Sequence, residues 1–246
     1  MRYLMTFSYD GSNYSGYQKQ PKKKAVQCEI EKALKIISNS KISINASGRT
    51  DAGVHALNQK AHFDLDMNIT EDKLKNALNS LIPNDIYIKN IEEVNDTFHA
   101  RFNVKAKEYI YKINMGEYNP IEKDYILQYN KKLDVVEMER ALKYLEGTHD
   151  FKSFAKADDE NNDFIRTIVQ TSLIRDMKNI NNITISFLGT GFLRYMVRNM
   201  VGTLMEIGEG KRKSEEIIDI LAATDRTKAG ITAKPEGLYL KDVFYH

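Results

Sequence analysis

Apolar and polar residues alternate along the opening segment RYLMTFSYD. The apolar positions on one side of it are Tyr3, Met5, Phe7 and Tyr9. A period of two is typical of a half-buried strand. From Val26 to Ser38 the apolar positions recur instead at helical spacing, which predicts a helix that packs one stripe against a sheet.

The pattern that follows predicts three more strands and a second helix. The predicted strands are Ile42–Ser47, Lys60–Met67 and Ile86–Val94. Thr70, which precedes two acidic residues, is typical of a helix N-cap, and Pro83 ends the helix that it opens. The resulting order, β-α-β-β-α-β, is the split arrangement of ferredoxin-like folds.

The rest of the chain repeats this order loosely. Strands are predicted at Tyr109–Met115, Thr167–Arg175, Asn182–Leu188 and Leu238–Phe244, and helices at Val135–Leu145, Leu193–Ile207 and, as an insertion, Ser214–Ala223. The polar segment Ala155–Asp163 is typical of a mobile surface loop. We place the boundary near residues 100 to 106, which gives an N-terminal α+β half at residues 1–104 and a C-terminal α+β half at residues 105–246.

Two sheets of this kind can join edge to edge, because pairing hides their exposed edge strands. We therefore expect an α+β fold in which two ferredoxin-like or RRM-like halves form one mostly antiparallel sheet. Helices should lie on one side of this sheet. A central cleft where the halves meet would be the natural place for an active site.

The composition agrees with a globular fold. Hydrophobic residues make up 42% and charged residues 28% of the 246 residues, so neither disorder nor a fibrous architecture is indicated. The opening residues lack the apolar core of a signal peptide, and no uncharged run approaches the roughly 18 residues of a membrane helix, so we expect a cytoplasmic protein. The single cysteine, Cys28, can form neither an internal disulfide nor a thiolate cluster.

Positive charge is concentrated in short stretches of the chain. The 36 Lys and Arg residues outnumber the 34 Asp and Glu residues by so little that the net charge of +2 identifies no polyanionic partner. The basic stretches are Lys19–Lys24, the arginines of FLRYMVRNM and Lys211–Lys213. Because such stretches are usually solvated surface, they leave contact with nucleic acid open.

The segment SGRTDAGVHA, Ser47–Ala56, carries an unusual density of functional groups for a connection between two strands. Its glycines permit backbone conformations that other residues resist, so the loop could hold the Asp51 carboxylate in a cleft. A plain turn, in which Thr50 or Asp51 caps a short helix and His55 is packed, explains the same residues. Both interpretations stay open on this segment alone.

The same segment resembles the signature loop of the TruA family of tRNA pseudouridine synthases, in which the aspartate is the catalytic nucleophile. Five further segments follow the pattern of that family in its order. They are YDGSNYSGYQKQ (Tyr9–Gln20), FHARFNVKAKEYIYKI (Phe98–Ile113), LEGTHDFKSF (Leu145–Phe154), GFLRYMVRNMVGTLMEIG (Gly191–Gly208) and DRTKAGITAKPEGLYLKDV (Asp225–Val243). The resemblance therefore covers nearly the whole chain.

The resemblance assigns roles to four residues. It makes Asp51 the nucleophile, Tyr109 the aromatic residue that meets the target base, Arg198 the partner of the Asp51 carboxylate and Arg49 a helper in extruding the base. Composition alone would place Tyr109 in the core, in step with its strand neighbours, and Arg198 on a solvated basic stripe. For the histidines in the matched segments, His55, His99 and His149, we expect structural hydrogen bonding.

The resemblance also implies a substrate and an assembly. It implies a homodimer that acts on the anticodon stem-loop of tRNA, at positions 38 to 40, without a metal, small-molecule cofactor or membrane. Three departures put details of RNA contact in doubt. Tyr17 stands where the family usually has Trp, the family often has a basic residue near Glu209, and both Lys156 and the acidic stretch after it are atypical.

Three other functions stay open. A non-catalytic RRM-like RNA-binding protein has the same order of elements, but its strand motif K/R-G-F/Y-G/A-F-V-x-F/Y is missing from the sequence. A TruA paralogue that modifies a different RNA site would carry the same residues. A metal-dependent nuclease or deaminase is disfavoured, because the sequence has no HxE with PCxxC and no dense carboxylate cluster.

Overall fold

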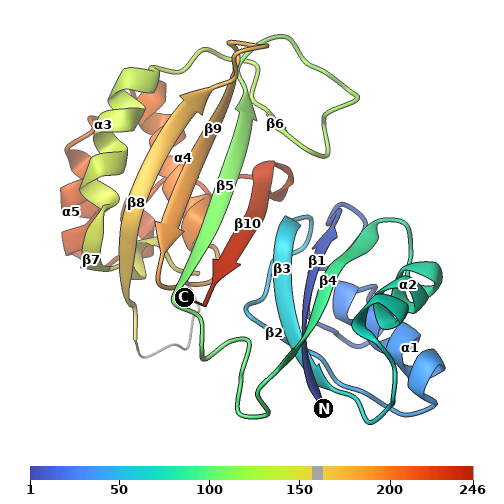
Figure 1. Cartoon of the computed structure of the whole chain (residues 1–246). Coiled ribbons are helices and arrows are strands. Elements are labelled where there is room, and N and C mark those ends of the chain that lie inside the picture. Colours follow the sequence, from blue (N-terminus) through green and yellow to red (C-terminus); the bar gives the residue numbers. More distant parts are fainter. Residues whose placement is uncertain (157–162, 246) are drawn as a thin grey trace. The chain divides into compact units, whose positions relative to one another are not determined.

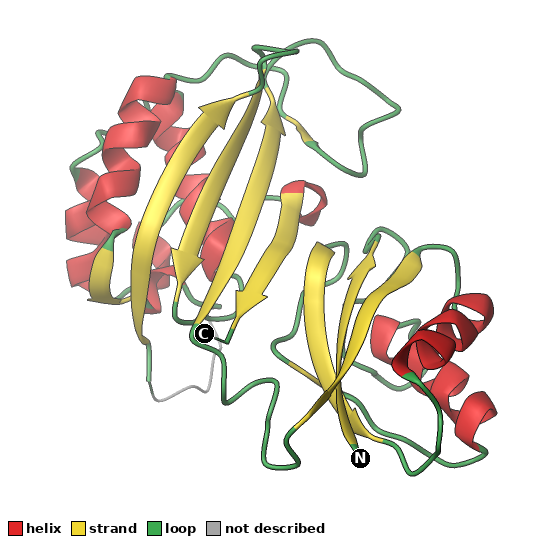
Figure 2. Cartoon of the chain, viewed as in Figure 1, coloured by secondary structure: helices red, strands yellow, loops and turns green. Residues whose placement is uncertain are grey.

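The computed structural model describes residues 1–156 and 163–245. The chain forms two compact units, Met1–Lys105 with Tyr239–His246, and Ala106–Leu238. Figure 1 labels the elements, and Figure 2 distinguishes helices from strands. Most of the surface loop predicted at Ala155–Asp163 lies outside the described residues.

The first unit is a sheet with two helices. Its elements are β1 (Arg2–Tyr9), α1 (Val26–Ser38), β2 (Asn45–Ala46), β3 (His55–Asp64), α2 (Glu71–Leu81), β4 (Ile86–Val94) and the greater part of β10 (Leu238–Phe244). The strand order is β4-β1-β3-β10, and β2 also pairs with β3. The succession β4, β1, β3, β2 is that of a ferredoxin-like fold, which confirms the split arrangement predicted for this part of the chain.

The apolar side of β1 forms the core of this unit. Tyr3, Met5 and Phe7 are all buried, and the helices α1 and α2 cover the same sheet on one face (Figure 2). Met5 lies opposite Ala61 of β3 and Ile91 of β4 in antiparallel pairs. The alternation read from the sequence is therefore confirmed as the buried face of a central strand.

The strand predicted at Ile42–Ser47 is wrong in extent, because only Asn45 and Ala46 pair with β3. The backbone N–H of Ile44 donates instead to the carboxylate of Glu31, 3.2 Å away. Strand β3, by contrast, begins at His55, five positions before the predicted Lys60. Its early residues gain ladder partners on both sides, from β1 and from the parallel strand β10.

The second unit is a sheet with three helices. Its elements are β5 (Ala106–Asn114), β6 (Leu127–Gln128), α3 (Val135–Leu145), β7 (Gly147–Asp150), β8 (Ile165–Arg175), β9 (Asn182–Gly189), α4 (Met196–Gly208) and α5 (Glu216–Ala223), with short 3₁₀ turns at Lys152–Phe154, Arg226–Lys228 and Pro235–Gly237. The strand order is β5-β9-β8-β7, all antiparallel, and β6 pairs in parallel with β5. The helices α3, α4 and α5 lie on one face of this sheet (Figure 1).

Helix α4 begins at Met196 and not at the predicted Leu193. The residue before it, Tyr195, has a φ of 65°, a left-handed conformation that cannot continue a right-handed helix. Thr70 does occupy the N-cap of α2, but its side chain makes no capping bond. Asp134 makes such a bond at α3, where its carboxylate accepts from the backbone N–H groups of Val136 and Glu137.

The predicted α+β class with mostly antiparallel strands is confirmed. The division into halves at residues 104 and 105 stays a prediction, as does the joining of two sheets around a cleft. Tyr239 and the residues after it group with the first unit, where Tyr239 pairs with His55 and Leu240 with Ala56. Across the described ranges, no helix is long and apolar enough to cross a membrane.

Candidate active site

The loop Ser47–Ala56 is held from one side by the segment that follows β1. The Tyr9 hydroxyl and the Thr50 hydroxyl form a buried hydrogen bond of 2.7 Å. The backbone N–H of Tyr17 donates to the Thr50 carbonyl oxygen at 3.2 Å, and that of Val54 donates to the Asp51 carbonyl oxygen at 3.2 Å. The backbone on both sides of Asp51 is therefore fixed.

Two glycines allow the segment after β1 to come this close. A Cβ atom on Gly11 would lie 2.0 Å from the Val54 carbonyl oxygen, and one on Gly16 would lie 2.7 Å from the Thr50 carbonyl oxygen. Gly16 also has a φ of +100°, which disfavours any other residue. The glycines of YDGSNYSGYQ thus allow this segment to pack against the backbone of the loop that carries Asp51.

The other end of the loop is tied to β3 by polar side chains. The Ser47 hydroxyl donates to the Gln59 side-chain oxygen at 2.7 Å, and the Gln59 amide donates to the Gly48 carbonyl oxygen at 3.1 Å. Ser47 and Gln59 are fully buried. Between these anchors, Asp51 is half-buried and Arg49 is exposed.

His55 is structural, as predicted. Its Nδ1 atom accepts the backbone N–H of Gly11 at 3.1 Å, and its ring stacks on Tyr239 at 4.6 Å. The same Nδ1 lies 3.3 Å from a carboxylate oxygen of Asp10, but a nitrogen that accepts the Gly11 N–H carries no proton to share with it. The backbone bond therefore determines the orientation of the ring.

The other two histidines in the matched segments also make hydrogen bonds to the backbone. His99 accepts the N–H of Arg101 at 3.1 Å, and the Nε2 atom of His149 lies 2.8 Å from the Glu146 carbonyl oxygen. The prediction of structural hydrogen bonding is confirmed for all three histidines.

Tyr109 lies on β5 in the second unit. It is 8% exposed, and its ring meets that of Phe192 edge-on at 5.0 Å. It stands opposite Phe187 of β9. Tyr111, on the same side of the strand, donates its hydroxyl to the Lys234 carbonyl oxygen at 2.6 Å, and burial raises the pKa of that phenol. The aromatic side of β5 is thus packed from several directions.

Arg198 lies in the first turn of α4 and is half-buried. Its Nε atom donates to the Ala233 carbonyl oxygen at 2.7 Å, and its guanidinium carbon lies 5.0 Å from the centre of the Tyr195 ring. Arg194, four residues earlier, is exposed. The two arginines therefore do not form one solvated stripe, and the guanidinium of Arg198 is oriented by the segment that precedes β10.

Three further residues, Asn199, Arg226 and Thr232, position the segment that precedes β10. The buried Asn199 donates to the carbonyl oxygens of Phe154 and Ala155, and its side-chain oxygen accepts from Arg226 at 3.0 Å and from Thr232 at 2.7 Å. No local pattern in the sequence marks Asn199, because all four of these partners lie far from it in the chain. Asn199, Arg226 and Thr232 join α4 to the segment that receives the Arg198 bond.

Gly202 explains how closely that segment packs. A Cβ atom on it would lie 1.6 Å from the Ile231 carbonyl oxygen. Only glycine allows the chain at this point to rest directly on α4.

The departures from the family pattern have local explanations. Tyr17 is 3% exposed, packs against Phe7 at 6.3 Å and has no hydrogen-bond partner for its hydroxyl within the described residues. Tyr17 belongs to the core, and its burial raises the pKa of the phenol. Glu209 ends α4 and pairs with Lys211 and Lys131, so the pKa of its carboxyl is lowered. Lys156 donates its backbone N–H to the Arg194 carbonyl oxygen.

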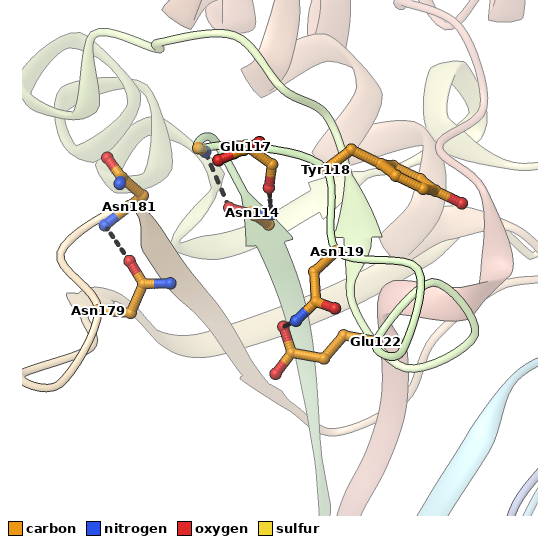
Figure 3. Close-up of a pocket in the computed structure, with 8 residues that line it drawn as sticks. Asn114, Glu117, Tyr118, Asn119, Glu122, Asn179 and Asn181 are labelled. Carbon is orange, nitrogen blue, oxygen red and sulfur yellow. Dashed lines mark hydrogen bonds between the residues drawn. The ribbon is translucent and has the colours of Figure 1, made fainter.

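The pocket drawn in Figure 3 is separate from these residues. It has a volume of about 310 Å³ and is lined by Asn114, Gly116, Glu117, Tyr118, Asn119, Glu122, Asn179 and Asn181. The buried amide of Asn114 donates to the Glu117 carbonyl oxygen and to Gln128, so its hydrogen-bonding capacity is used within the fold. None of the predicted site residues lines this pocket.

The structure thus brings Arg49 and Asp51 together on one loop of the first unit, and it places Tyr109 and Arg198 in the second unit. In the part of the chain that is described, no group of three His, Cys, Asp or Glu residues could hold a metal ion.

Comparison with known proteins decides the family. The sequence profile of the family described as tRNA pseudouridine synthase matches residues 5–103 and 141–246. The chain belongs to this family. The resemblance read from the sequence is confirmed, and membership makes the chain an isomerase.

Individual members of the family align with the chain from end to end. The tRNA pseudouridine synthase A of Geobacillus sp. (strain WCH70) is 44% identical over 246 residues, covering 99% of this chain and 98% of the relative. That of Anoxybacillus flavithermus is 44% identical with the same coverage. That of Lacticaseibacillus casei is 44% identical and covers 99% of both chains.

Proposed function

We propose that this chain converts uridine to pseudouridine in the anticodon stem-loop of tRNA, at positions 38 to 40, with Asp51 as the nucleophile. The observation that carries the proposal is the construction of the loop Ser47–Ala56, whose backbone is fixed on both sides of Asp51. A fixed loop presents a carboxylate in one orientation, as a covalent reaction requires.

A carboxylate suits this reaction. Pseudouridine formation breaks the bond between ribose C1′ and uracil N1, turns the base and rejoins it through C5. Because the atoms of the nucleotide are conserved, the reaction needs neither an oxidant nor an energy source. An aspartate side chain has a reference pKa of about 3.9 in water, and its carboxylate can form and release a covalent adduct. Attack on C1′ and removal of the C2′ proton to give a glycal are both open to it.

Arg198 is proposed to hold the Asp51 carboxylate in its ionised form. An opposite charge within a few ångströms favours ionisation, and a guanidinium can donate hydrogen bonds to both carboxylate oxygens. The contact of its Nε atom with the Ala233 carbonyl oxygen supports this role, because it limits the directions in which the guanidinium can point.

Tyr109 and Arg49 are proposed to handle the extruded base. Removing a uridine from its stack costs a few kcal/mol, and stacking on an aromatic ring returns roughly 1 to 3 kcal/mol. Tyr109 has the ring for this, supported at its edge by Phe192. Arg49 is exposed beside Asp51 on the same loop, where a cation could take the place left by the base or contact a phosphate.

The partners follow from the substrate. We propose that tRNA is bound mainly through phosphate contacts from local basic stretches, that two copies of the chain form a homodimer, and that the enzyme works in the cytoplasm without a dissociable cofactor. The net charge of +2 supports local phosphate contacts over a general electrostatic attraction.

Tritium release from tRNA labelled at uridine C5 tests the reaction, because only formation of the C5 bond frees the label. Sequencing of pseudouridines in tRNA from cells lacking the protein then tests the position. We expect the purified chain to release tritium, and tRNA from cells lacking the protein to lack pseudouridine at positions 38 to 40. Release together with losses elsewhere would assign the chain to another RNA site, and no release from any tRNA would refute the proposed reaction.

A further inference from the structure

A turn after β4 in the first unit presents an aromatic ring to solvent. Phe102 is 76% exposed. A single exposed apolar residue needs no explanation in itself. Here, however, the surrounding backbone is fixed by side chains whose contacts hold the ring in place.

His99 is the centre of this arrangement. Its Nδ1 atom accepts the backbone N–H groups of Arg101 at 3.1 Å and of Phe102 at 3.4 Å. The side-chain oxygen of Asn103 accepts the His99 N–H at 2.6 Å, and the Asn103 N–H returns a bond to the His99 carbonyl oxygen at 3.0 Å. The turn that bears Phe102 therefore has a defined conformation.

The turn is also fixed to the body of the unit. The buried His62 of β3 accepts the backbone N–H of Ala100 at 3.1 Å, and the Tyr245 hydroxyl donates to the Ala100 carbonyl oxygen at 2.8 Å. The ring of His62 meets that of His99 edge-on at 4.6 Å. A chain of contacts thus connects the central sheet to the exposed ring.

The ring is supported on one flank and bordered by positive charge. Its centre lies 4.2 Å from that of the His99 ring at a tilt of 31°, and the guanidinium carbon of Arg101 lies 6.0 Å from it. Arg101 is exposed, and so are Lys105 and the acidic Asp96, which are close to Phe102 in the sequence. An aromatic ring held rigidly beside a guanidinium is the combination that stacks unpaired bases while the cation meets the phosphate.

We propose that Phe102 is a stacking platform for an unpaired nucleotide of the RNA substrate, and that Arg101 contacts the adjoining phosphate. The proposal rests on the proposed function only in taking tRNA as the substrate. The platform is a substrate-positioning site and has no part in breaking or forming bonds. Rigid presentation lowers the conformational entropy lost when the nucleotide binds, which favours a fixed ring over a flexible one.

The absence of tryptophan from the chain allows a direct test. In the variant Phe102→Trp the only indole stands at the platform, and stacking of a base should quench its emission as unmodified tRNA is added. The control is Ile36→Trp, on α1 of the same unit, where the native residue is 67% exposed and no stacking is expected. We expect added tRNA to quench the emission of Phe102→Trp, with the midpoint of the titration near the wild-type Kd. The emission of Ile36→Trp should not change.

Filter binding of Phe102→Ala and Arg101→Gln separates stacking from charge. Loss of the ring should weaken tRNA binding by about 5-fold to 150-fold without changing the salt dependence. Loss of the guanidinium should reduce the slope of log Kd against log salt by about 0.7 to 0.9. Because Phe102 is largely exposed, the melting temperature of Phe102→Ala should stay close to that of the wild type.

Two outcomes would overturn the proposal. One is unchanged emission of Phe102→Trp together with binding by Phe102→Ala within twofold of the wild type. The other is a change in self-association of Phe102→Ala during sedimentation without RNA, which would assign the ring to a contact between copies of the chain. Failure of the wild-type protein to release tritium would instead refute the proposed reaction. The fluorescence titration would still show whether a nucleotide of tRNA stacks on residue 102.

Discussion

The phenol of Tyr9, at the end of β1, shares a buried hydrogen bond of 2.7 Å with the hydroxyl of Thr50, the residue before Asp51. This bond joins the central strand of the first unit to the loop of the proposed nucleophile. Burial raises the pKa of Tyr9 to about 12, so the phenol stays protonated throughout the physiological range. The position of Asp51 thus depends on a neutral pair in the core.

Tyr9→Phe should weaken this connection. Loss of the hydroxyl should lower the free energy of unfolding by about 0.5 to 1.5 kcal/mol and reduce kcat more than it raises KM, because the loop is less well fixed. Urea denaturation and tritium release measure the two effects. Tyr3→Phe is the matched control, since the hydroxyl of that buried phenol on the same strand donates to the Met1 sulfur and not to the loop of Asp51. Equal loss of activity in both variants would contradict the role given to Tyr9.

The raised pKa of Tyr9 also gives a pH dependence. Between pH 10 and pH 12 the unfolded chain has lost this proton while the folded chain keeps it, so stability should fall as pH rises through this window. The contribution of Tyr9 is at most roughly 3 kcal/mol. The free energy of unfolding, measured by denaturation, should fall less between pH 9 and pH 11 in Tyr9→Phe than in the wild type. An equal fall in both proteins would mean that Tyr9 is not the group responsible.

Gly16→Ala should damage the loop from outside. The new methyl group would meet the Thr50 carbonyl oxygen at 2.7 Å, and the φ of +100° adds strain. We expect a loss of more than about 1 kcal/mol of stability and at least a tenfold fall in kcat, because small displacements of a nucleophile are costly. Gly210→Ala has a similar φ of +72° but nothing within 4 Å, so it should lose stability only. Full activity in Gly16→Ala would show that the loop tolerates displacement.

Asp51→Asn should separate binding from chemistry. The amide keeps the shape of the side chain but cannot serve as a nucleophile that later leaves, so tritium release should vanish. Binding of tRNA should stay within about tenfold, or roughly 1.4 kcal/mol, because phosphate contacts and stacking provide most of the affinity. Asp66→Asn, an exposed acid of the same unit, controls for the change in charge. Wild-type turnover in Asp51→Asn would remove Asp51 from the mechanism.

Tyr109→Phe should keep the stacking face and much of the tRNA binding, whereas Tyr109→Ala should lose activity severely. The alanine variant also leaves a space beside Phe192 and should be less stable. Ile110→Ala provides the comparison, because Ile110 is also 8% exposed and adjoins Tyr109 on β5. If both variants lose stability and activity in parallel, Tyr109 is a core residue and its catalytic assignment is wrong.

Arg198→Lys should lower kcat/KM by about tenfold or more. An ammonium cannot donate from the Nε position to the Ala233 carbonyl oxygen and also present a planar fork to a carboxylate. Arg194→Lys, on the exposed residue four positions earlier, should have little effect on the chemical step. Steady-state tritium release compares the two, and equal rates in Arg198→Lys and the wild type would refute the proposed role.

Local patterns in the sequence determined most of the elements. The alternation of Tyr3, Met5 and Phe7 specified a strand with one buried face, and the helical period of Val26–Ser38 specified α1 from end to end. The density of functional groups in Ser47–Ala56 indicates the candidate loop from the sequence alone. Such features depend on neighbours within a few residues, and the sequence displays them directly.

Tertiary contacts decided the rest. Strand β3 begins at His55 because β1 and β10 provide ladder partners there, and the ends of those strands lie far from His55 in the chain. Gly11 and Gly16 must be glycine because the backbones of Val54 and Thr50 pack directly against them, and these contacts form only in the folded unit. The sequence likewise does not indicate the structural role of Asn199, since its four hydrogen-bond partners come from three segments distant in the chain. Contacts between residues distant in sequence depend on how the whole unit packs, and no local period encodes them.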